Sequence, residues 1–391
     1  MAKVVAMTGN TAAYTGAALC RPDLIAAYPI TPQSSVVEGL AGMVYNGKLN
    51  SNFVQVESEH SAMSVVQGAA AAGGRVFTAT SAQGLALMYE PYFRMSTLRI
   101  PMVMAIATRE MTSPETIWSG QQDAMSVREA GWIQMFCESN QEILDMMIQG
   151  YRIAEDERVS LPVNICYDGF YSSHLIEGLE VPSQAEVDAF LPAYKGYTYL
   201  DPSHPQALDP LTPGELMMKY RKNHLDAMEA ALDVIDKVDA KFAAAFGRSY
   251  GGCIEEYRTE DAEVVLVTVG GMSGTGKDAV DAAREKGIKA GLIKLRFVRP
   301  FPAKRLAKAL QGKKAFAVVD RSVSFGWSRG PMYMETKAAI ADAEQKYASF
   351  SAIGGLGGAD LSFEHMLGCI EKLEAAKNKP GEKETVWLMN D

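Results

Sequence analysis

The chain has 391 residues, of which 48% are hydrophobic and 22% charged, and its formal net charge is -9. This composition is normal for a soluble globular protein and suggests two or three domains. The sequence has no basic stripe, which argues against a nucleic-acid partner, and no apolar run approaches the ~20 residues of a membrane span.

The cysteine pattern limits the redox chemistry of the chain. Five cysteines are scattered through the sequence and none belongs to a C-x-x-C pair. An odd, dispersed set argues against a disulfide framework and against iron–sulfur ligation or another metal site in this polypeptide. Because the N-terminus also lacks the shape of a signal peptide, we expect buried reduced thiols and a cytoplasmic location.

Residues 1–180 alternate strand and helix signals. The predicted strands cover 24–28, 53–57, 75–79, 102–108 and 163–167, and helices are predicted over 61–72 and 84–96. This alternation is typical of a doubly wound α/β domain. Gly73 and Gly74 suit the end of the first of these helices.

The regular alternation of strand and helix signals stops over residues 181–255. Six prolines, the last at Pro213, interrupt regular structure, and apolar residues then follow helical spacing over about 214–246. We expect an extended connector closed by a helix that packs between two domains.

A second α/β unit is predicted over 256–375. Its strands are expected at 264–269, 291–295 and 315–320, with a helix at about 275–287 and a glycine-rich turn at 354–358. The fold class is therefore α/β, with two doubly wound domains joined by the connector. The polar tail over 376–391 is expected to be loose.

The segment from Gly271 to Asp278 has the spacing G-x-x-x-x-G-K of a phosphate-binding loop. Asp278 stands where such a loop needs a serine or threonine, and its charge would repel a phosphate. We therefore favour a glycine turn that lets a helix pack tightly against its strand. A weak anion site at the helix N-terminus remains open.

Three predicted strands of the first unit end in polar turns that carry Thr31, Glu59 and Arg109. Because the carboxyl ends of parallel strands collect at one edge of a sheet, these side chains should converge. A desolvated Glu59 would have a raised pKa and could share a proton with a ligand nitrogen. Arg109 and Thr31 could hold the carboxylate of a 2-oxoacid.

Simpler interpretations exist for each of these residues. Glu59 suits a helix N-terminus, Arg109 a sheet cap and Thr31 a turn. Ser81 and Gln83, at the same edge, would either line a pocket or cap the next helix. The segment after Arg109, with Trp118, is long enough to form a lid.

Seven segments form a recognisable set. They are Tyr28–Pro32, Glu57–Ala62, Thr78–Leu85 and Gln122–Met125 in the first unit, and Leu295–Pro302, Val319–Arg321 and Gly354–Gly358 in the second. In this order they resemble the α subunit of pyruvate:ferredoxin oxidoreductases and, more broadly, the 2-oxoacid:acceptor oxidoreductases that use thiamine diphosphate and coenzyme A. The similarity covers nearly the whole chain.

The resemblance implies a pyrimidine-binding domain for thiamine diphosphate over 1–180 and a transketolase C-terminal-like domain over 256–375. It implies that Glu59 hydrogen-bonds the aminopyrimidine ring of the cofactor and that Thr31 and Arg109 bind the substrate carboxylate. Further cofactor contacts are expected from Pro29, Ile30, Ser81 and Gln83. The implied reaction is oxidative decarboxylation of a 2-oxoacid, pyruvate before others, to acyl-CoA and carbon dioxide.

The resemblance also implies partner subunits. The sequence lacks the Gly-Asp-Gly motif that holds Mg²⁺ and the diphosphate, and its nearest match, Tyr167-Asp168-Gly169, lacks the first glycine. We therefore expect a β-type subunit for Mg²⁺ and the diphosphate, a γ-type subunit, and a ferredoxin-like subunit that carries [4Fe-4S] clusters. Electrons would pass to ferredoxin or another acceptor, and the active site would form at a subunit interface.

Several alternatives stay open. Thr31 fits a pyruvate-type site, whereas the less familiar segment 111–118 could shape a roomier pocket for 2-oxoisovalerate or phenylglyoxylate. A non-oxidative thiamine-dependent decarboxylase or transketolase relative is the first rival. A non-catalytic scaffold subunit is the second.

Overall fold

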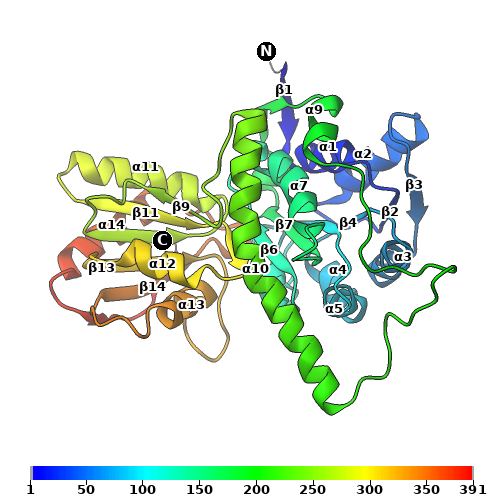
Figure 1. The fold of residues 1–391 in the computed structure, drawn as a ribbon. Helices are drawn as coiled ribbons and strands as arrows, with labels where there is room; N and C mark the ends of the chain where they lie inside the picture. The colour runs from blue at the N-terminus through cyan, green and yellow to red at the C-terminus, as the bar shows by residue number, and fades with distance from the viewer. Residues whose placement is uncertain (1–2, 390–391) are drawn as a thin grey trace.

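The computed structural model describes residues 3–389 and places a sheet-based unit on each side of one long helix (Figure 1). The first sheet has the strand order β12 (Phe297–Arg299), β6 (Ile133–Phe136), β7 (Val163–Asp168), β5 (Val103–Thr108), β4 (Val76–Thr80), β2 (Leu24–Ala27) and β3 (Asn52–Gln55). All neighbours are parallel except β12, which runs antiparallel to β6. The parallel pairing confirms the predicted fold class.

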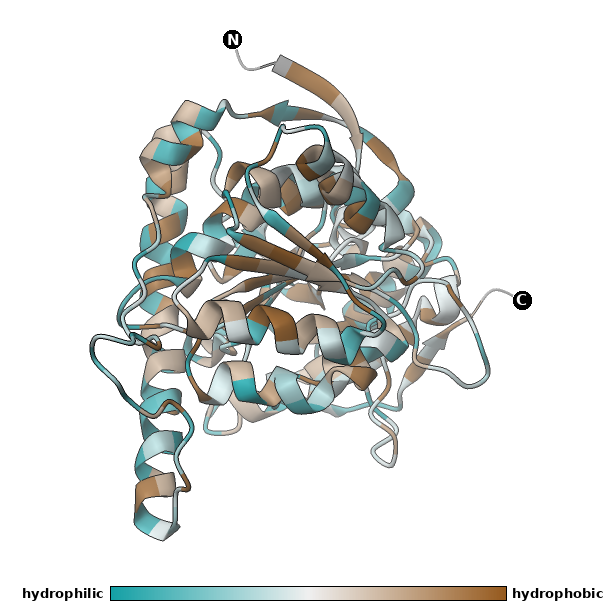
Figure 2. Ribbon diagram, turned by 90° about the vertical axis from the view of Figure 1, so that its right-hand side faces the viewer, coloured by the Kyte–Doolittle hydropathy of each residue, from teal (hydrophilic) through white to brown (hydrophobic). Residues whose placement is uncertain are grey.

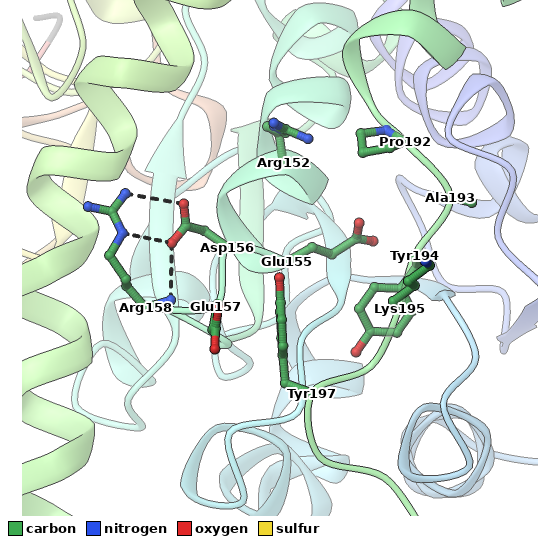
Figure 3. A pocket seen from close by; sticks show the side chains of 10 residues that line it. All are labelled: Arg152, Glu155, Asp156, Glu157, Arg158, Pro192, Ala193, Tyr194, Lys195 and Tyr197. Atoms are coloured by element: carbon green, nitrogen blue, oxygen red, sulfur yellow. Dashed lines mark hydrogen bonds and ion pairs between the residues drawn. The ribbon is translucent and has the colours of Figure 1, made fainter.

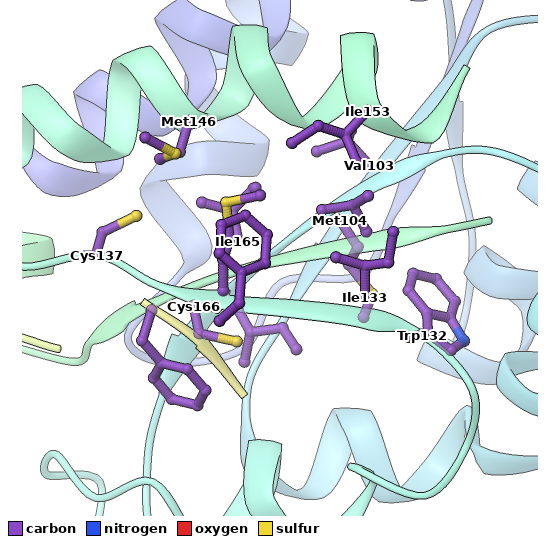
Figure 4. Packing of buried hydrophobic residues seen from close by; sticks show 14 of the residues in the cluster. Val103, Met104, Trp132, Ile133, Cys137, Met146, Ile153, Ile165 and Cys166 are labelled. Atoms are coloured by element: carbon purple, nitrogen blue, oxygen red, sulfur yellow. The ribbon is translucent and has the colours of Figure 1, made fainter. Parts of the chain in front are cut away.

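Helices cover both faces of this sheet. They are α1 (Gly9–Leu19), α2 (Ser34–Tyr45), α3 (Glu59–Ala71), α4 (Ala82–Leu87), α5 (Tyr89–Thr97), α6 (Gln122–Ser126) and α7 (Asn140–Ala154). Strands β4, β5 and β7 are buried along their whole length, as expected for a sheet covered on both sides. Figure 4 shows Met146 and Ile153 of α7 above the strand residues Met104 and Ile165, with Trp132 at the end of the cluster.

Two short strands and two short helices complete the first unit. Strand β1 (Lys3–Thr8) pairs antiparallel with β8 (Ile176–Val181), and the short helices are α8 (Tyr171–His174) and α9 (Gln184–Phe190). The sequence did not predict β1, β6 or α7, and the helix expected over 84–96 is split into α4 and α5.

The long helix α10 (Gly214–Phe246) follows an irregular segment. Its first turns project from the body and are exposed, whereas Ala227, Val234 and Phe242 further along are buried. The helix ends at Gly247, whose left-handed backbone suits a C-terminal cap. Figure 1 shows α10 between the two units, and Figure 2 shows its mixed hydropathy beside the apolar strands.

The second sheet also has seven strands. They are β15 (Gly381–Glu382), β14 (Ala348–Gly354), β13 (Ala315–Asp320), β10 (Val264–Thr268), β11 (Ala290–Leu295) and β9 (Ile254–Tyr257), with β16 (Val386–Leu388) paired to β14. Its helices are α11 (Met272–Glu285), α12 (Ala303–Leu310), α13 (Pro331–Ala339) and α14 (Phe363–Ala376), with a 3₁₀ turn η1 (Leu356–Gly358).

One expectation about the C-terminal half is wrong, and one strand pairing there was not predicted. The tail is not loose over its described part, because β15 and β16 both pair with β14. Strand β12, which lies within the second unit in sequence, crosses back and pairs with β6 of the first sheet. Strands of only two or three residues are too short to give a periodicity from which such pairings could be read.

The segment from Gly271 to Asp278 is not an open phosphate loop. Helix α11 already begins at Met272. Lys277, which a phosphate loop would need, instead pairs with Glu138 at 2.9 Å and with Glu255 at 2.7 Å. The structure therefore supports the glycine-turn interpretation.

A buried ion cluster joins the two units. Lys294 and Arg296 both contact the carboxylate of Glu142 near the start of α7, with the Lys294 Nζ to Glu142 Oε2 distance at 2.7 Å. All three side chains are at most 1% exposed. Burial alone would raise the pKa of Glu142, but the charges of Lys294 and Arg296 hold it at about 2. The cluster therefore fixes β11 against α7.

Within residues 3–389, no helix combines the length and the apolarity that crossing a membrane would require.

Candidate active site

The structure brings Thr31 and Arg109 into contact at the carboxyl edge of the first sheet. Arg109 follows β5, and its Nη1 donates to the backbone oxygen of Thr31 at 2.9 Å. Its Nε donates to the backbone oxygen of Thr116 at 3.0 Å. Among residues 3–389, Nη2 of this buried guanidinium has no hydrogen-bond partner, so one edge of the fork remains free for an anion.

Glu59 begins α3 directly after β3 and is only 6% exposed. Its carboxylate lies against Gly84, where an added Cβ would be 2.6 Å from Oε1. Burial raises the pKa of Glu59, and its own backbone N–H at the helix start partly offsets the rise. A carboxylate in this position is suited to share a proton with a ligand.

Asp123 links the turn beside Glu59 to Arg109. Its Oδ2 accepts hydrogen bonds from the backbone N–H of Ala82 at 2.9 Å and of Arg109 at 3.0 Å. Its Oδ1 accepts from the N–H of Ala124 at 2.7 Å. Burial raises the pKa of Asp123 to about 7, although these three N–H groups lower it. The motif around Asp123 was noticed in the sequence, but this positioning role was not predicted.

Asp123→Asn should destabilise the chain by about 1–3 kcal/mol, because an amide NH₂ would oppose one of the converging N–H groups. The folded-state pKa of Asp123 lies above the unfolded value, so ionisation of Asp123 weakens the wild-type protein as pH rises from about 4 to about 7. The difference in free energy of unfolding between the wild type and the variant should therefore decrease over that pH range.

Urea unfolding midpoints between pH 4.5 and pH 8 would measure this gap. Asp209→Asn, at an exposed ion pair with Arg94, is the matched control and should change little. A gap that stays constant with pH would contradict the assigned titration.

Hydrogen bonds from buried side chains hold the turn that carries Pro29, Ile30 and Thr31. The side-chain amide of Asn10 donates to the backbone oxygen of Pro32 at 2.7 Å. The hydroxyl of Tyr167 in turn donates to Oδ1 of Asn10 at 2.8 Å. Pro29 and Thr31 are exposed and Ile30 is half-buried, so the turn is open to solvent in the single chain. Nothing in the sequence pattern singled out Asn10.

Ser81 and Gln83 lie differently. Ser81 is fully buried, and its hydroxyl donates to the backbone oxygens of Thr80 and Ala107 at 2.9 and 2.7 Å. The hydroxyl proton is therefore used inside the sheet, and a cofactor contact from Ser81 stays a prediction. Oε1 of Gln83 and Oγ1 of Thr80 are buried without a partner among the described residues. These polar atoms fit a polar ligand beside Glu59.

The segment from Glu110 to Gln121 is fastened to the second unit. Gly358 donates its N–H to the backbone oxygen of Ser119 at 2.7 Å, and Gln121 donates to that of Arg321 at 3.0 Å. The Arg321 guanidinium also pairs with Asp168 at 3.2 Å. Asp168 is thus committed to a contact between the units, and the predicted lid is anchored at its C-terminal end.

A cavity of about 620 Å³ lies elsewhere, beneath the connector (Figure 3). Its charged groups are paired only in part: Arg158 contacts Asp156 at 3.0 Å and Glu155 contacts Arg75 at 2.6 Å. None of Thr31, Glu59 and Arg109 lines this cavity, and we place the chemistry at the sheet edge that carries them. All five cysteines are buried and free. No group of His, Cys, Asp or Glu in the described part of the chain is arranged to hold a metal ion.

Residues 15–240 match the family model described as "Pyruvate flavodoxin/ferredoxin oxidoreductase, thiamine diP-bdg". The chain belongs to the pyruvate flavodoxin/ferredoxin oxidoreductase family. Residues 262–366 match a second model, "Pyruvate:ferredoxin oxidoreductase core domain II". The resemblance inferred from the sequence motifs is therefore confirmed.

Relatives of this oxidoreductase family align along their full length. The chain is 47% identical to the NADH-dependent phenylglyoxylate dehydrogenase subunit alpha of Aromatoleum evansii, covering 99% of this chain and 95% of that protein. It is 41% identical to the pyruvate synthase subunit PorA of Methanothermobacter thermautotrophicus, covering 98% and 97%. Both are named as subunits of larger enzymes.

Two solved structures share the fold of this family member. A 2-oxoglutarate:ferredoxin oxidoreductase from Magnetococcus marinus superposes with a TM-score of 0.72 at 20% identity, over 94% of this chain and 65% of that chain. A split-gene transketolase superposes with a TM-score of 0.52 at 10% identity, over 95% and 99%. At these identities the likeness establishes the architecture alone.

Proposed function

We propose that this chain is the α subunit of a CoA-acylating 2-oxoacid:acceptor oxidoreductase and supplies the pyrimidine side of its thiamine diphosphate site. The contact between Arg109 and Thr31, at the same sheet edge as the buried carboxylate of Glu59, carries this proposal. The homologous subunits of pyruvate synthase and phenylglyoxylate dehydrogenase support it.

Glu59 would hold a proton against a ring nitrogen of the pyrimidine. Its burial and its raised pKa favour a shared proton over a solvated charge. Gln83 and Thr80 offer polar atoms next to it, and Pro29 and Ile30 would border the ring. When bound, thiamine diphosphate supplies a nucleophilic carbon and accepts the electron pair that decarboxylation releases.

Arg109 and Thr31 would bind the substrate. The free edge of the Arg109 guanidinium can pair with a carboxylate, and the exposed Thr31 hydroxyl can donate to the same group. Both interactions hold a 2-oxoacid until its carboxylate leaves as carbon dioxide. They orient the keto carbon but perform no proton transfer themselves.

Partner subunits complete the proposed enzyme. A β-type subunit would hold Mg²⁺ and the diphosphate, a γ-type subunit would join the complex, and a ferredoxin-like subunit would carry [4Fe-4S] clusters. The subunit names of the relatives and the exposed turn around Thr31 support an active site closed by another chain.

The test of this proposal uses Arg109→Ala in the complete complex, with a 2-oxoacid, CoA and a viologen dye as acceptor. Losing the buried cationic partner of a carboxylate should weaken transition-state binding by an amount on the order of 2–4 kcal/mol. The corresponding fall in kcat/KM should come mostly from a higher KM. Arg94→Ala, at an exposed ion pair, is the control.

An unchanged KM would favour the scaffold interpretation. Decarboxylation without dye reduction would instead favour a non-oxidative thiamine-dependent enzyme.

A further inference from the structure

Phe170 has an unusual backbone. It follows Gly169 at the end of β7, and its φ of 61° places a bulky side chain in the left-handed region. Such a conformation is strained and persists only where the surroundings enforce it. Here the N–H of Phe170 donates to Oγ of Ser173 at 2.7 Å, which helps to hold the backbone in this conformation.

The Phe170 ring belongs to an aromatic cluster. Its centroid lies 4.4 Å from that of Trp118 and 4.8 Å from that of His174. Trp118 is 49% exposed in the single chain, so a broad aromatic face remains open to a ligand. Aromatic rings that keep one face free gain stability when another ring packs on them.

This cluster lies beside Arg109 and Thr31, the two residues proposed to bind the substrate carboxylate, which we call the clamp. The N–H of Gly169 donates to the backbone oxygen of Thr108, which directly precedes Arg109, at 3.0 Å. A Cβ added at Gly169 would lie 2.9 Å from Pro32, the neighbour of Thr31. Phe170 therefore leaves the sheet between the two clamp residues.

Trp118 is tied to Arg109 from the other side. Arg109 Nε donates to the backbone oxygen of Thr116, and the N–H of Trp118 donates to the Thr116 hydroxyl at 3.2 Å. The second unit packs closely against the same tryptophan, because a Cβ added at Gly358 would lie 2.6 Å from Trp118 Cβ. The hydroxyl of Tyr171 donates to the backbone oxygen of Gly358 at 2.8 Å and holds this turn in place.

We propose that Trp118 and Phe170 form an aromatic wall that selects 2-oxoacids with an aromatic ring on the keto carbon. The inference rests on the proposed function, because it takes the Arg109 and Thr31 clamp to hold the carboxylate. With that end fixed, the side group extends along the neighbouring surface. A phenyl group would cover much of the exposed indole face, whereas the methyl group of pyruvate would cover little.

The experiment compares phenylglyoxylate and pyruvate as substrates of the complete complex. Trp118→Ala and Phe170→Leu should each lower kcat/KM for phenylglyoxylate by at least about tenfold, mainly through KM. For pyruvate the change should stay below about twofold, and Trp118→Phe should restore most of the activity on phenylglyoxylate. Trp327→Ala, at an exposed tryptophan of the second unit, should leave both substrates unaffected.

Gly358→Ala adds a test that removes neither aromatic side chain. The new methyl group would displace Trp118, so it should also weaken phenylglyoxylate more than pyruvate. This variant keeps the inference testable if removal of an aromatic ring prevents assembly.

The other outcomes separate the two proposals. Oxidation of pyruvate but not of phenylglyoxylate by the wild-type complex would overturn the aromatic wall and leave the proposed function standing. Equal losses on both substrates in the Trp118 and Phe170 variants would show that the cluster only supports the fold. Oxidation of no 2-oxoacid at all would refute the proposed function itself and, with it, the wall.

Discussion

Glu59→Gln should lower turnover by about 10²–10⁴-fold while the complex still assembles. Glutamine has the shape of glutamate and fills the same space above Gly84, but its amide cannot hold a proton for a ring nitrogen. The measurement is steady-state dye reduction with a 2-oxoacid and CoA, together with gel filtration to follow assembly.

Glu57→Gln is the matched control. Glu57 lies two residues earlier and is exposed, and a hydrogen bond from Ser61 lowers its pKa. The control should retain normal turnover. Full activity of Glu59→Gln would remove Glu59 from the chemistry.

The stability of the Glu59 variant gives an independent readout. Because burial raises the folded-state pKa of Glu59 above its unfolded value, its ionisation weakens the fold as pH rises through that interval. Glutamine carries no such charge. The variant should therefore unfold at a temperature equal to or above that of the wild type at pH 8, which separates lost chemistry from lost structure.

Glu142→Gln should destabilise the chain by about 3–5 kcal/mol, the usual effect of removing one partner from a buried ion pair. Lys294 and Arg296 would be left with their charges buried between the two units and only Glu138 and Glu255 nearby. Urea unfolding at pH 7 measures the effect.

The pH dependence of the same site has a defined sign. The folded-state pKa of Glu142 is depressed to about 2, so its contribution is present above the unfolded value of about 4.3 and is lost as pH falls towards 2. The difference in free energy of unfolding between wild type and variant should therefore decrease at acidic pH. Glu129→Gln, at an exposed partner of Arg299, should change stability by less than about 0.5 kcal/mol. A Glu142 effect as small as this control would contradict the structural role of the cluster.

Much of the site could be predicted because it follows a rule of topology. Thr31, Glu59 and Arg109 each sit at the end of a parallel strand, and the ends of such strands meet at one edge. The contact between Arg109 and Thr31 is a direct result of that arrangement.

Asp123, Asn10 and Ser81 could not be placed in this way. Asp123 acts by accepting backbone N–H groups from two turns, and Asn10 acts through the backbone oxygen of Pro32. Such contacts depend on where the backbone passes and leave no trace in hydrophobic spacing. The contact of the Ser81 hydroxyl with the backbone oxygen of Ala107 likewise depends on the sheet geometry.

The strand that crosses back has a consequence for the history of these proteins. Phe297 pairs with Met135 and Arg299 with Gln134, so the first sheet is incomplete without residues encoded far downstream. A gene exchange that replaced everything after residue 255 would bring in a foreign edge strand and leave its counterpart behind. The two units are therefore structurally coupled, and a hybrid between relatives joined near residue 255 has to form this strand pair from two different parents.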